Sequence, residues 1–484
     1  MSYSSFDHII PTEFIEALDS PAFTEFLRQI RNSSSKLLSV TLPIAPIDPL
    51  AALELNPDYD EKFYWDHPDN KISISAAGKV VELKATGSNR FEEISQQTFD
   101  LKGKIDAYTA IQHDMAGPLF LGGYSFDNYN IGKVWKKFGA ARFILPEWMV
   151  VRSGNLHLLT LTIDKKSFTV DEIYQEIISH ITSFISLSGN LQNHIEPETI
   201  SSNILCTLQS PDDRNRWFQK VEHAKKMIRD KIFEKIVLAR TVTLQMQHQP
   251  HFTQLTHQLR QKYPECFNFM VQKDSDTAFI GATPERLASF SDGKFMTEGL
   301  AGSTSRGHSA VEDAALAQNL LDSSKDRDEH EFVVRAINDN LKKFSYRVEH
   351  PKKPGIKKLK NVQHLFTPIS ASIKKGVQIH ELINEMHPTP AVGGYPRKEA
   401  VSHIHEIEQM DRGWYAAPVG WFNLNGSGEF AVAIRSALIN KNRATLYAGC
   451  GIVADSDPEK EWNETLLKFK PMMDSLNRNQ SRNE

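Results

Sequence analysis

Hydrophobic and polar residues alternate in short runs along the second half of the chain, and glycine, aspartate or asparagine separates many of the runs. This alternation predicts strands at 235–244, 267–272, 277–282, 286–291, 294–299, 416–424, 429–439 and 444–450. Short turns that end at Gly293 and Gly426 favour hairpins. The strands are therefore expected to form antiparallel sheets.

Helical spacing of apolar residues occurs at fewer places. It predicts helices near 12–31, 170–188, 309–321, 325–344 and 376–386, one that starts near Ser210, and a terminal one. Asp457 can cap the terminal helix, and Pro458 suits its first position. Its expected apolar face comprises Trp462, Leu466, Phe469 and Met473. Hairpins with separate helices indicate an α+β fold, in which helices cover large antiparallel sheets.

The patterns become clearer after about residue 205. The first half has strand-like runs at 35–42, 71–84, 118–125 and 156–163, and the polar stretch 189–204 is expected to be a connection. We therefore divide the chain into an N-terminal half (1–205), a main region (206–475) and a tail (476–484).

Composition narrows the class of protein. The chain has 484 residues, 40% of them hydrophobic and 24% charged, and a formal net charge of −4, which gives no indication of a nucleic-acid or membrane partner. We expect neither a signal peptide nor a membrane span, because no basic leader or long apolar run is present. Three widely spaced cysteines (Cys206, Cys266 and Cys450) fit a reducing cytoplasm.

Carboxylates on two of the predicted helices suggest a cation site. Glu461, Glu464 and Lys468 share a second face of the terminal helix, which suits a hard cation beside an anionic ligand. A solvated charged face is the alternative. Glu329 lies on the inner side of its helix, four residues before Val333, where a carboxylate is costly unless paired or bound to metal. Together these residues could hold Mg²⁺.

Two residues are candidates for proton transfer. Lys235 shares a strand face with Val237 and Ala239, and partial burial or a nearby cation would make it a usable base. A strand-end lysine that reaches water is the alternative. Glu285 occupies a tight turn between two predicted strands, where it could act as a general acid or simply lie at the surface.

Two further features could bind an anion. The glycine- and hydroxyl-rich segment 297–307, which includes Gly302 and Ser303, could offer backbone N–H groups to a carboxylate or phosphate, although it is not a Walker loop. Arg435 sits in an apolar strand and needs an anionic partner. A substrate carboxylate and a structural ion pair remain equally open.

Taken in order, these motifs resemble the chorismate-utilising enzymes, which include isochorismate, salicylate, anthranilate and aminodeoxychorismate synthases. The resemblance spans 206–475, and 121–127 and 141–146 look like the family's variable N-terminal half. It implies two large antiparallel sheets packed together with helices outside, chorismate as the substrate and Mg²⁺ as the cofactor. It implies no redox cofactor and no obligate protein partner.

The resemblance also implies roles for individual residues. Members that add water at chorismate C2 carry a lysine in a strand similar to Lys235–Arg240, and ammonia-using members generally lack it. Lys235 is then the base and Glu285 the acid that protonates the departing C4 hydroxyl. Glu329 and Glu464 correspond to Mg²⁺ ligands, with Glu461 beside them. The implied substrate contacts are Gly302, Ser303, His364 near the ring, Tyr415, Arg435, Gly451 and Lys468.

The run 387–394 looks more like isochorismate synthases than salicylate synthases, and the long N-terminal half favours the menaquinone-pathway type. A salicylate synthase, a siderophore-pathway isochorismate synthase and a non-catalytic chorismate-binding relative remain alternatives. Lys235 disfavours an anthranilate synthase. Gly299 and Ser303 depart from the alanine and threonine usual at these positions, which affects selectivity rather than the reaction.

Overall fold

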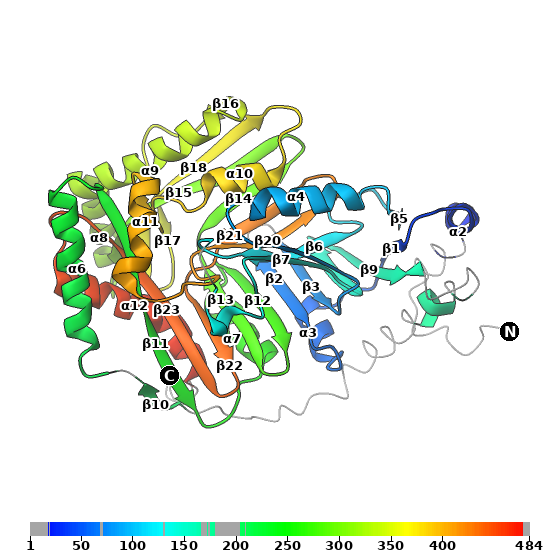
Figure 1. Ribbon diagram of the computed structural model, residues 1–484, viewed down its shortest axis with the longest axis horizontal. Coiled ribbons are helices and arrows are strands. Elements are labelled where there is room, and N and C mark those ends of the chain that lie inside the picture. Colours follow the sequence, from blue (N-terminus) through cyan, green and yellow to red (C-terminus); the bar gives the residue numbers. More distant parts are fainter. Residues whose placement is uncertain are drawn as a thin grey trace.

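The computed structural model describes residues 20–67, 71–128, 131–165, 175–179, 204–208 and 210–477, together with positions 18 and 172 (Figure 1). Most of the predicted helix 170–188, the early part of the helix 12–31, the connection 189–204 and most of the tail lie outside these residues. None of the described helices is long and apolar enough to cross a membrane.

The larger sheet has 13 strands and draws on both halves of the chain. In spatial order it contains β10 (Ile204–Leu208), β11 (Lys235–Met246), β23 (Arg443–Ile452), β22 (Ser436–Asn440), β13 (Thr277–Thr283), β12 (Phe267–Asp274), β2 (Lys62–His67), β3 (Ile72–Ala77), β8 (Trp148–Ser153), β9 (Leu156–Asp164), β1 (Leu37–Pro43) and β5 (Ile105–Thr109), while β19 (Gly394–Tyr395) pairs with β11. All pairs are antiparallel except β1 with β5.

The second sheet has 10 strands. Its order is β16 (Ser345–Glu349), β18 (Val362–Ile373), β15 (Lys294–Ser305), β14 (Arg286–Ser291), β21 (Gly428–Val432), β20 (Pro418–Asn423), β6 (Leu119–Tyr124), β7 (Ala141–Leu145) and β4 (Val81–Ala85), with β17 (Gly355–Lys358) on β18. The predicted α+β fold with two large, almost entirely antiparallel sheets is confirmed.

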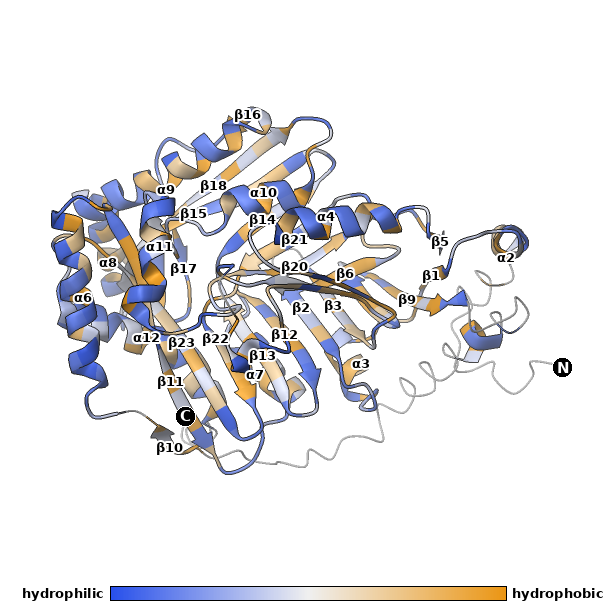
Figure 2. Cartoon of the chain, in the orientation of Figure 1, coloured by the Kyte–Doolittle hydropathy of each residue, from blue (hydrophilic) through white to orange (hydrophobic). Residues whose placement is uncertain are grey.

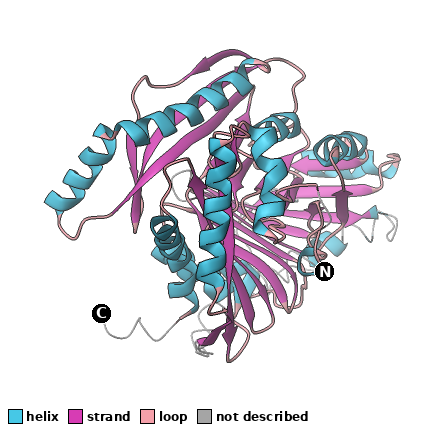
Figure 3. Ribbon diagram, turned by 60° about the vertical axis from the view of Figure 1, so that its left-hand side comes forward, coloured by secondary structure: helices cyan, strands magenta, loops and turns pink. Residues whose placement is uncertain are grey.

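Helices lie around the two sheets, as Figure 3 shows. They are α2 (Pro21–Arg31), α3 (Pro49–Glu54), α4 (Arg90–Leu101), α6 (Asp213–Arg229), α7 (Phe252–Lys262), α8 (Ala310–Asp322), α9 (Ser324–Lys342), α10 (Ile379–Met386), α11 (Arg397–Glu408) and α12 (Pro458–Leu476), with a short 3₁₀ turn at Lys133–Trp135. Asp457 caps α12 as predicted, because its side chain accepts hydrogen bonds from two backbone N–H groups of the first turn.

Successive residues of a strand face opposite sides, and this builds two cores. In β2, Phe63 and Trp65 join a core that includes side chains from both sheets. Tyr64, between them, joins a second core under α3, α7 and α12. Figure 2 shows hydrophobic residues concentrated in the strands of both sheets, while α4 and α6 carry many hydrophilic residues.

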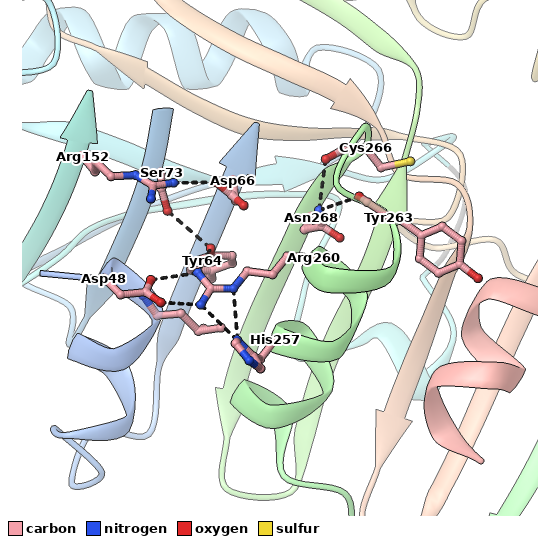
Figure 4. Close-up of polar contacts among 11 residues, drawn as sticks. Asp48, Tyr64, Asp66, Ser73, Arg152, His257, Arg260, Tyr263, Cys266 and Asn268 are labelled. Carbon is pink, nitrogen blue, oxygen red and sulfur yellow. Dashed lines mark hydrogen bonds and ion pairs between the residues drawn. The ribbon is translucent and has the colours of Figure 1, made fainter. Parts of the chain in front are cut away.

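The second core contains a polar network that joins the two halves of the chain (Figure 4). Asp48 caps α3, and its carboxylate forms an ion pair with Arg260 of α7. The Arg260 guanidinium also donates to the Tyr64 hydroxyl at 3.2 Å. The N-terminal half is therefore fixed against the C-terminal region by charge as well as by apolar packing.

The chain passes between the sheets at two neighbouring crossings. The first connects β13 to β14 and contains Glu285, and the second connects β21 to β22 and contains Arg435. The Val432 N–H donates to the Glu285 carbonyl at 3.0 Å, and the Ala282 N–H donates to the Arg435 carbonyl at 3.2 Å. These bonds bring the two predicted site residues to one junction.

The crossings correct one prediction and decide between two alternatives for Glu285. The run 429–439 is two strands in different sheets, and Arg435 lies between them with a positive φ of 53° instead of within an apolar strand. Glu285 lies in a short connection between two strands, as predicted, but with 5% of its surface exposed the connection is buried and not at the surface. Apolar residues continue into the second crossing, as Ala433 and Ile434, because the strands on both sides of it are buried.

The predicted apolar face of the terminal helix is also partly wrong. Leu466 is 44% exposed, whereas Thr465, Phe469, Met472 and Leu476 are buried. These four residues are spaced by 4, 3 and 4, which follows the helical period. Of these, the buried positions 465 and 472 each lie one residue before the predicted Leu466 and Met473. The correct face therefore places a threonine in the core, a residue that hydrophobicity alone does not mark.

Candidate active site

A cavity of about 100 Å³ lies beside the two crossings. Every predicted site residue except Glu461 is on its wall, namely Lys235, Glu285, Gly302, Ser303, Glu329, His364, Tyr415, Arg435, Gly451, Glu464 and Lys468. A larger groove of about 640 Å³ between α4 and α10 contains none of these residues. Chemistry rather than size therefore selects the small cavity as the candidate site.

Lys235 is the first residue of β11, and its ammonium lies 2.5 Å from the carboxylate of Glu329 on α9. Gly451 is on the adjacent strand β23. A Cβ atom on Gly451 would lie 2.7 Å from Lys235 Cε and 3.3 Å from its Nζ. The missing side chain at Gly451 therefore makes the space that the lysine occupies.

Glu285 is the buried acid of the cavity. Burial, and then the charge of Glu298, raise the pKa of Glu285 to about 7. The Thr389 hydroxyl donates a hydrogen bond to its carboxylate at 3.4 Å and opposes this rise in part. A large fraction of Glu285 is therefore protonated near neutral pH and able to donate a proton.

Two carboxylates enter the cavity from different helices. Burial alone would raise the pKa of Glu329, but the Lys235 ammonium outweighs it and holds that pKa below its ordinary value. Glu464 of α12 behaves in the same way, because Lys468 lies 2.5 Å from its carboxylate. Both groups are ionised at neutral pH, and each depends on a cation for this.

Glu461 lies one turn earlier on α12 but does not line the cavity. Cys450 Sγ donates to the backbone carbonyl of Glu461 at 3.8 Å. Burial, and then the charge of Glu464, raise the pKa of Glu461. The structure thus brings Glu329 and Glu464 together and turns Glu461 aside. Among the described residues, no group of three His, Cys, Asp or Glu side chains is arranged to hold a metal ion.

Strands β15 and β18 form a wall of small and polar groups. Gly302 sits at a bulge with a φ of +74°, a conformation that glycine adopts without strain. The bulge aligns Ser303 with His364, and Ser303 Oγ lies 2.8 Å from His364 Nδ1. Burial lowers the pKa of His364 to about 3, so its ring is neutral. Its Nε2 atom has no hydrogen-bond partner among the described residues.

Cationic and aromatic groups complete the wall. Arg435 forms no ion pair with any described residue, although it lines the cavity. Lys468 also donates to the Gly449 carbonyl at 2.9 Å. Tyr415 stacks on Tyr447 with ring centroids 5.1 Å apart, and burial raises its pKa above the ordinary value. The cavity therefore presents cationic side chains and an aromatic ring to an anionic ligand.

Sequence reasoning did not assign three residues that the structure places at the site. Arg412 and Val392 line the cavity, and Thr389 contacts Glu285. Thr389 and Val392 belong to the run 387–394 that stood out in the sequence, but the contacts of all three residues are to backbone or to residues remote in the sequence. The presence of a motif was therefore visible in the sequence, whereas the role of each residue in it was not.

Comparison with known proteins agrees with this site. The family model described as "Chorismate binding enzyme" matches residues 24–477. The isochorismate synthase MenF of Bacillus subtilis is 33% identical over 449 residues, which cover 91% of this chain and 93% of that protein. The salicylate biosynthesis isochorismate synthase of Pseudomonas aeruginosa is 35% identical over 443 residues, covering 91% and 90%.

Solved structures share the fold. The menaquinone-specific isochorismate synthase MenF of Escherichia coli superposes with a TM-score of 0.75 at 24% identity, covering 94% of this chain and 99% of that one. Anthranilate synthase component I of Streptococcus pneumoniae gives a TM-score of 0.64 at 22% identity, covering 83% of this chain and 92% of that one. The resemblance inferred from the motifs is confirmed, and the chain belongs to the chorismate-binding enzyme family.

Proposed function

We propose that this protein is an isochorismate synthase, an isomerase that converts chorismate to isochorismate by adding water at C2 and losing the C4 hydroxyl. The observation that carries the proposal is that an amine, Lys235, and a protonatable buried carboxyl, Glu285, line the same small cavity. The two relatives with the sequence matches given above are both named isochorismate synthases, which supports this assignment.

In the proposed reaction, Lys235 acts as the base. To act, the ammonium that is paired with Glu329 must first lose a proton, and the resulting amine then accepts a proton from water as the water oxygen bonds to C2. The ring double bond migrates, and the C4 oxygen leaves with the proton that Glu285 donates. One water enters and one leaves, so the reaction is an isomerisation and needs no redox partner. Return of the Lys235 proton to Glu285 through solvent completes the cycle.

Substrate binding rests on the unpaired cation. Chorismate carries two carboxylates, and a guanidinium can bind a carboxylate through two parallel hydrogen bonds. Arg435 has no ion pair among the described residues, so a substrate carboxylate is favoured over a structural partner. Lys468 and the backbone at Gly302 and Ser303 are proposed to contribute further contacts. His364 Nε2 is proposed to face the ring.

The carboxylate pair fits Mg²⁺. Mg²⁺ is usually held by one or two protein carboxylates, with water and ligand oxygens in the other positions. Glu329 and Glu464 provide two ionised carboxylates in one cavity, and the charge of Glu464 acts on Glu329. These two residues would hold the ion, and the bound ion would offset the charge of the substrate and fix its orientation. Glu461 is proposed to lie next to these two ligands without binding the ion.

We further propose that the product feeds menaquinone biosynthesis. Use of isochorismate for salicylate or for a siderophore would involve the same reaction, and the Pseudomonas aeruginosa relative is named for salicylate biosynthesis. The test is to incubate the purified protein with chorismate and Mg²⁺ and to separate the products by chromatography. Isochorismate as the main product supports the proposal. Salicylate with pyruvate as the main products would replace it with salicylate synthase, and no turnover would favour a binding protein.

A further inference from the structure

The strand that carries Lys235 has a gap in its hydrogen bonding. On one side, β11 pairs with β23 over nearly its whole length. On the other side, β19 pairs with residues 235–236 and β10 pairs with residues 243–246. Between them, 237–242 face no strand within the described part of the chain. The backbone groups of this stretch need other partners, because a buried unpaired group is costly.

A buried ion pair supplies two of these partners, while the Val237 N–H donates to the Gly393 carbonyl at 3.1 Å. Glu408, at the end of α11, accepts a hydrogen bond from the Ala239 N–H at 2.6 Å. Arg412 Nη2 donates to the Val237 carbonyl at 2.7 Å. Both residues are 2% exposed, and two hydrogen bonds of 3.0 and 2.5 Å join their charged groups. The pair therefore takes the place of a missing strand, two residues from Lys235.

Arg412 also reaches the segment beside the proposed acid. Its Nη1 donates to the Val392 carbonyl at 2.9 Å. The Val392 N–H in turn donates to the Thr389 carbonyl at 3.1 Å, and the Thr389 hydroxyl contacts Glu285. One guanidinium thus connects the strand of the proposed base to the segment that contacts the proposed acid.

We propose that Arg412, oriented by Glu408, is a positioning residue that fixes Lys235 relative to Glu285. This inference rests on the proposed function for its kinetic consequence. A rigid spacing is useful because the base and the acid act on different carbons of one ring, and small displacements of catalytic groups are costly. A guanidinium suits this task better than an ammonium, because its planar donors contact three acceptors in fixed directions.

The experiment replaces Arg412 by lysine, which keeps the positive charge for Glu408 but cannot reach both carbonyls. We expect Arg412→Lys to lower kcat by roughly 100-fold while the KM for chorismate changes by less than about threefold. Arg260→Lys is the matched control, because Arg260 also forms an ion pair and donates to a further acceptor but lies away from the cavity (Figure 4). It is expected to keep the wild-type kcat.

A second measurement does not depend on turnover. Limited acylation followed by mass spectrometry gives the labelling of Lys235 relative to Lys468 in wild type and variant. A labelling ratio that shifts in folded Arg412→Lys but not in Arg260→Lys supports the inference. This holds even if the wild-type protein makes no isochorismate, because that result would refute only the proposed function. If Arg412→Lys does not fold, Glu408→Gln replaces it, because the glutamine keeps an oxygen for the Ala239 N–H.

Wild-type kcat and an unchanged labelling ratio in a folded variant would overturn the inference. A loss of kcat that Arg260→Lys shares to the same degree would also overturn it, since the effect would then reflect general destabilisation.

Discussion

Two groups of charged side chains in this protein differ in how completely their charges are satisfied. In the second core, the carboxylate of Asp48 and the guanidinium of Arg260 form an ion pair (Figure 4). Burial raises the pKa of Asp48, but the hydrogen bond and charge of Arg260 outweigh burial and hold that pKa below its ordinary value. In the cavity, Arg435 has no ion pair with any described residue, and His364 Nε2 has no partner among them.

The difference separates a structural network from a site. A closed network stabilises the charged forms of its members and has no need of a ligand. A cavity with an unpaired cation, a free ring nitrogen and a carboxyl of raised pKa is incomplete until a ligand with complementary groups enters. The predictions below test whether the two groups behave as differently as their contacts indicate.

The largest effect is expected from removing a proton-transfer group. Lys235→Ala and Glu285→Gln should each lower kcat by about 10²–10⁴-fold, the usual contribution of general acid or base catalysis. Chorismate binding should persist, because neither group is the proposed carboxylate contact. Steady-state kinetics and a binding titration measure the two properties. Near-wild-type turnover by either variant would show that its assigned role is wrong.

Removing the metal or its ligand should be nearly as severe. EDTA should abolish turnover, and excess Mg²⁺ should restore it, because Glu329 and Glu464 are the proposed ligands. Glu464→Ala should raise the Mg²⁺ concentration needed or abolish activity without unfolding the protein. Zn²⁺ should substitute poorly, since the two proposed metal ligands are both carboxylates and neither is a histidine or a cysteine. Full activity of thoroughly chelated enzyme would exclude this site.

The pH profile tests the acid. Because the pKa of Glu285 is raised to about 7, its protonated form is present below that pH and is lost as the pH increases. We expect kcat/KM, whose pH dependence reports the free enzyme, to fall as the pH passes upward through about 7. Glu298→Gln removes a charge that raises this pKa, so the fall should move to lower pH. A profile that the Glu298 substitution leaves in place would contradict the pairing of these carboxyls.

A smaller effect is expected at Gly451. A methyl group there would lie 2.7 Å from Lys235 Cε, so Gly451→Ala should displace a flexible side chain rather than the backbone. The expected loss is roughly 10–100-fold in kcat, with little change in unfolding free energy. Urea denaturation checks stability alongside the kinetics. If Gly451→Ala turned over chorismate as fast as the wild type, the space at Gly451 on β23 would not be needed to position Lys235.

The closed network should give the smallest effect on catalysis. Asp48→Asn should reduce the unfolding free energy by about 1 kcal/mol, a modest value because the pair is partly exposed. Its kcat should match the wild type, since Asp48 does not line the cavity. Urea denaturation and steady-state kinetics provide the comparison. A kcat loss as large as that of a cavity variant would remove the distinction between the two groups.

Much of the fold could be predicted because alternation marks strands. The strands of 267–272, 277–282, 286–291 and 444–450 agree with the structure within a few residues. The split of 429–439 could not be seen, because apolar residues continue across the junction and nothing local marks the left-handed φ at Arg435. The long strand Val362–Ile373 and the helices α4, α7 and α11 were also missing from the prediction.

The site was predictable where a residue type was unusual for its setting, as with Glu329 on an apolar helix face. Helical spacing could not separate Glu461 from Glu464, because Glu461 is contacted by Cys450 from a strand outside the helix, whereas Glu464 pairs with Lys468 of the same helix. The sequence also provided no reason to place Arg412 or Glu298 at the site. Their contacts join segments that are remote in sequence, and such contacts exist only after folding.

The most direct test of the account follows the oxygen atom. Chorismate is incubated with the protein and Mg²⁺ in water enriched in ¹⁸O, and early product is examined by mass spectrometry. If Lys235 activates water for attack at C2, the isochorismate carries one ¹⁸O atom at that position. Isochorismate without the label would mean that the hydroxyl moved within the substrate, and it would contradict the roles assigned to Lys235 and Glu285.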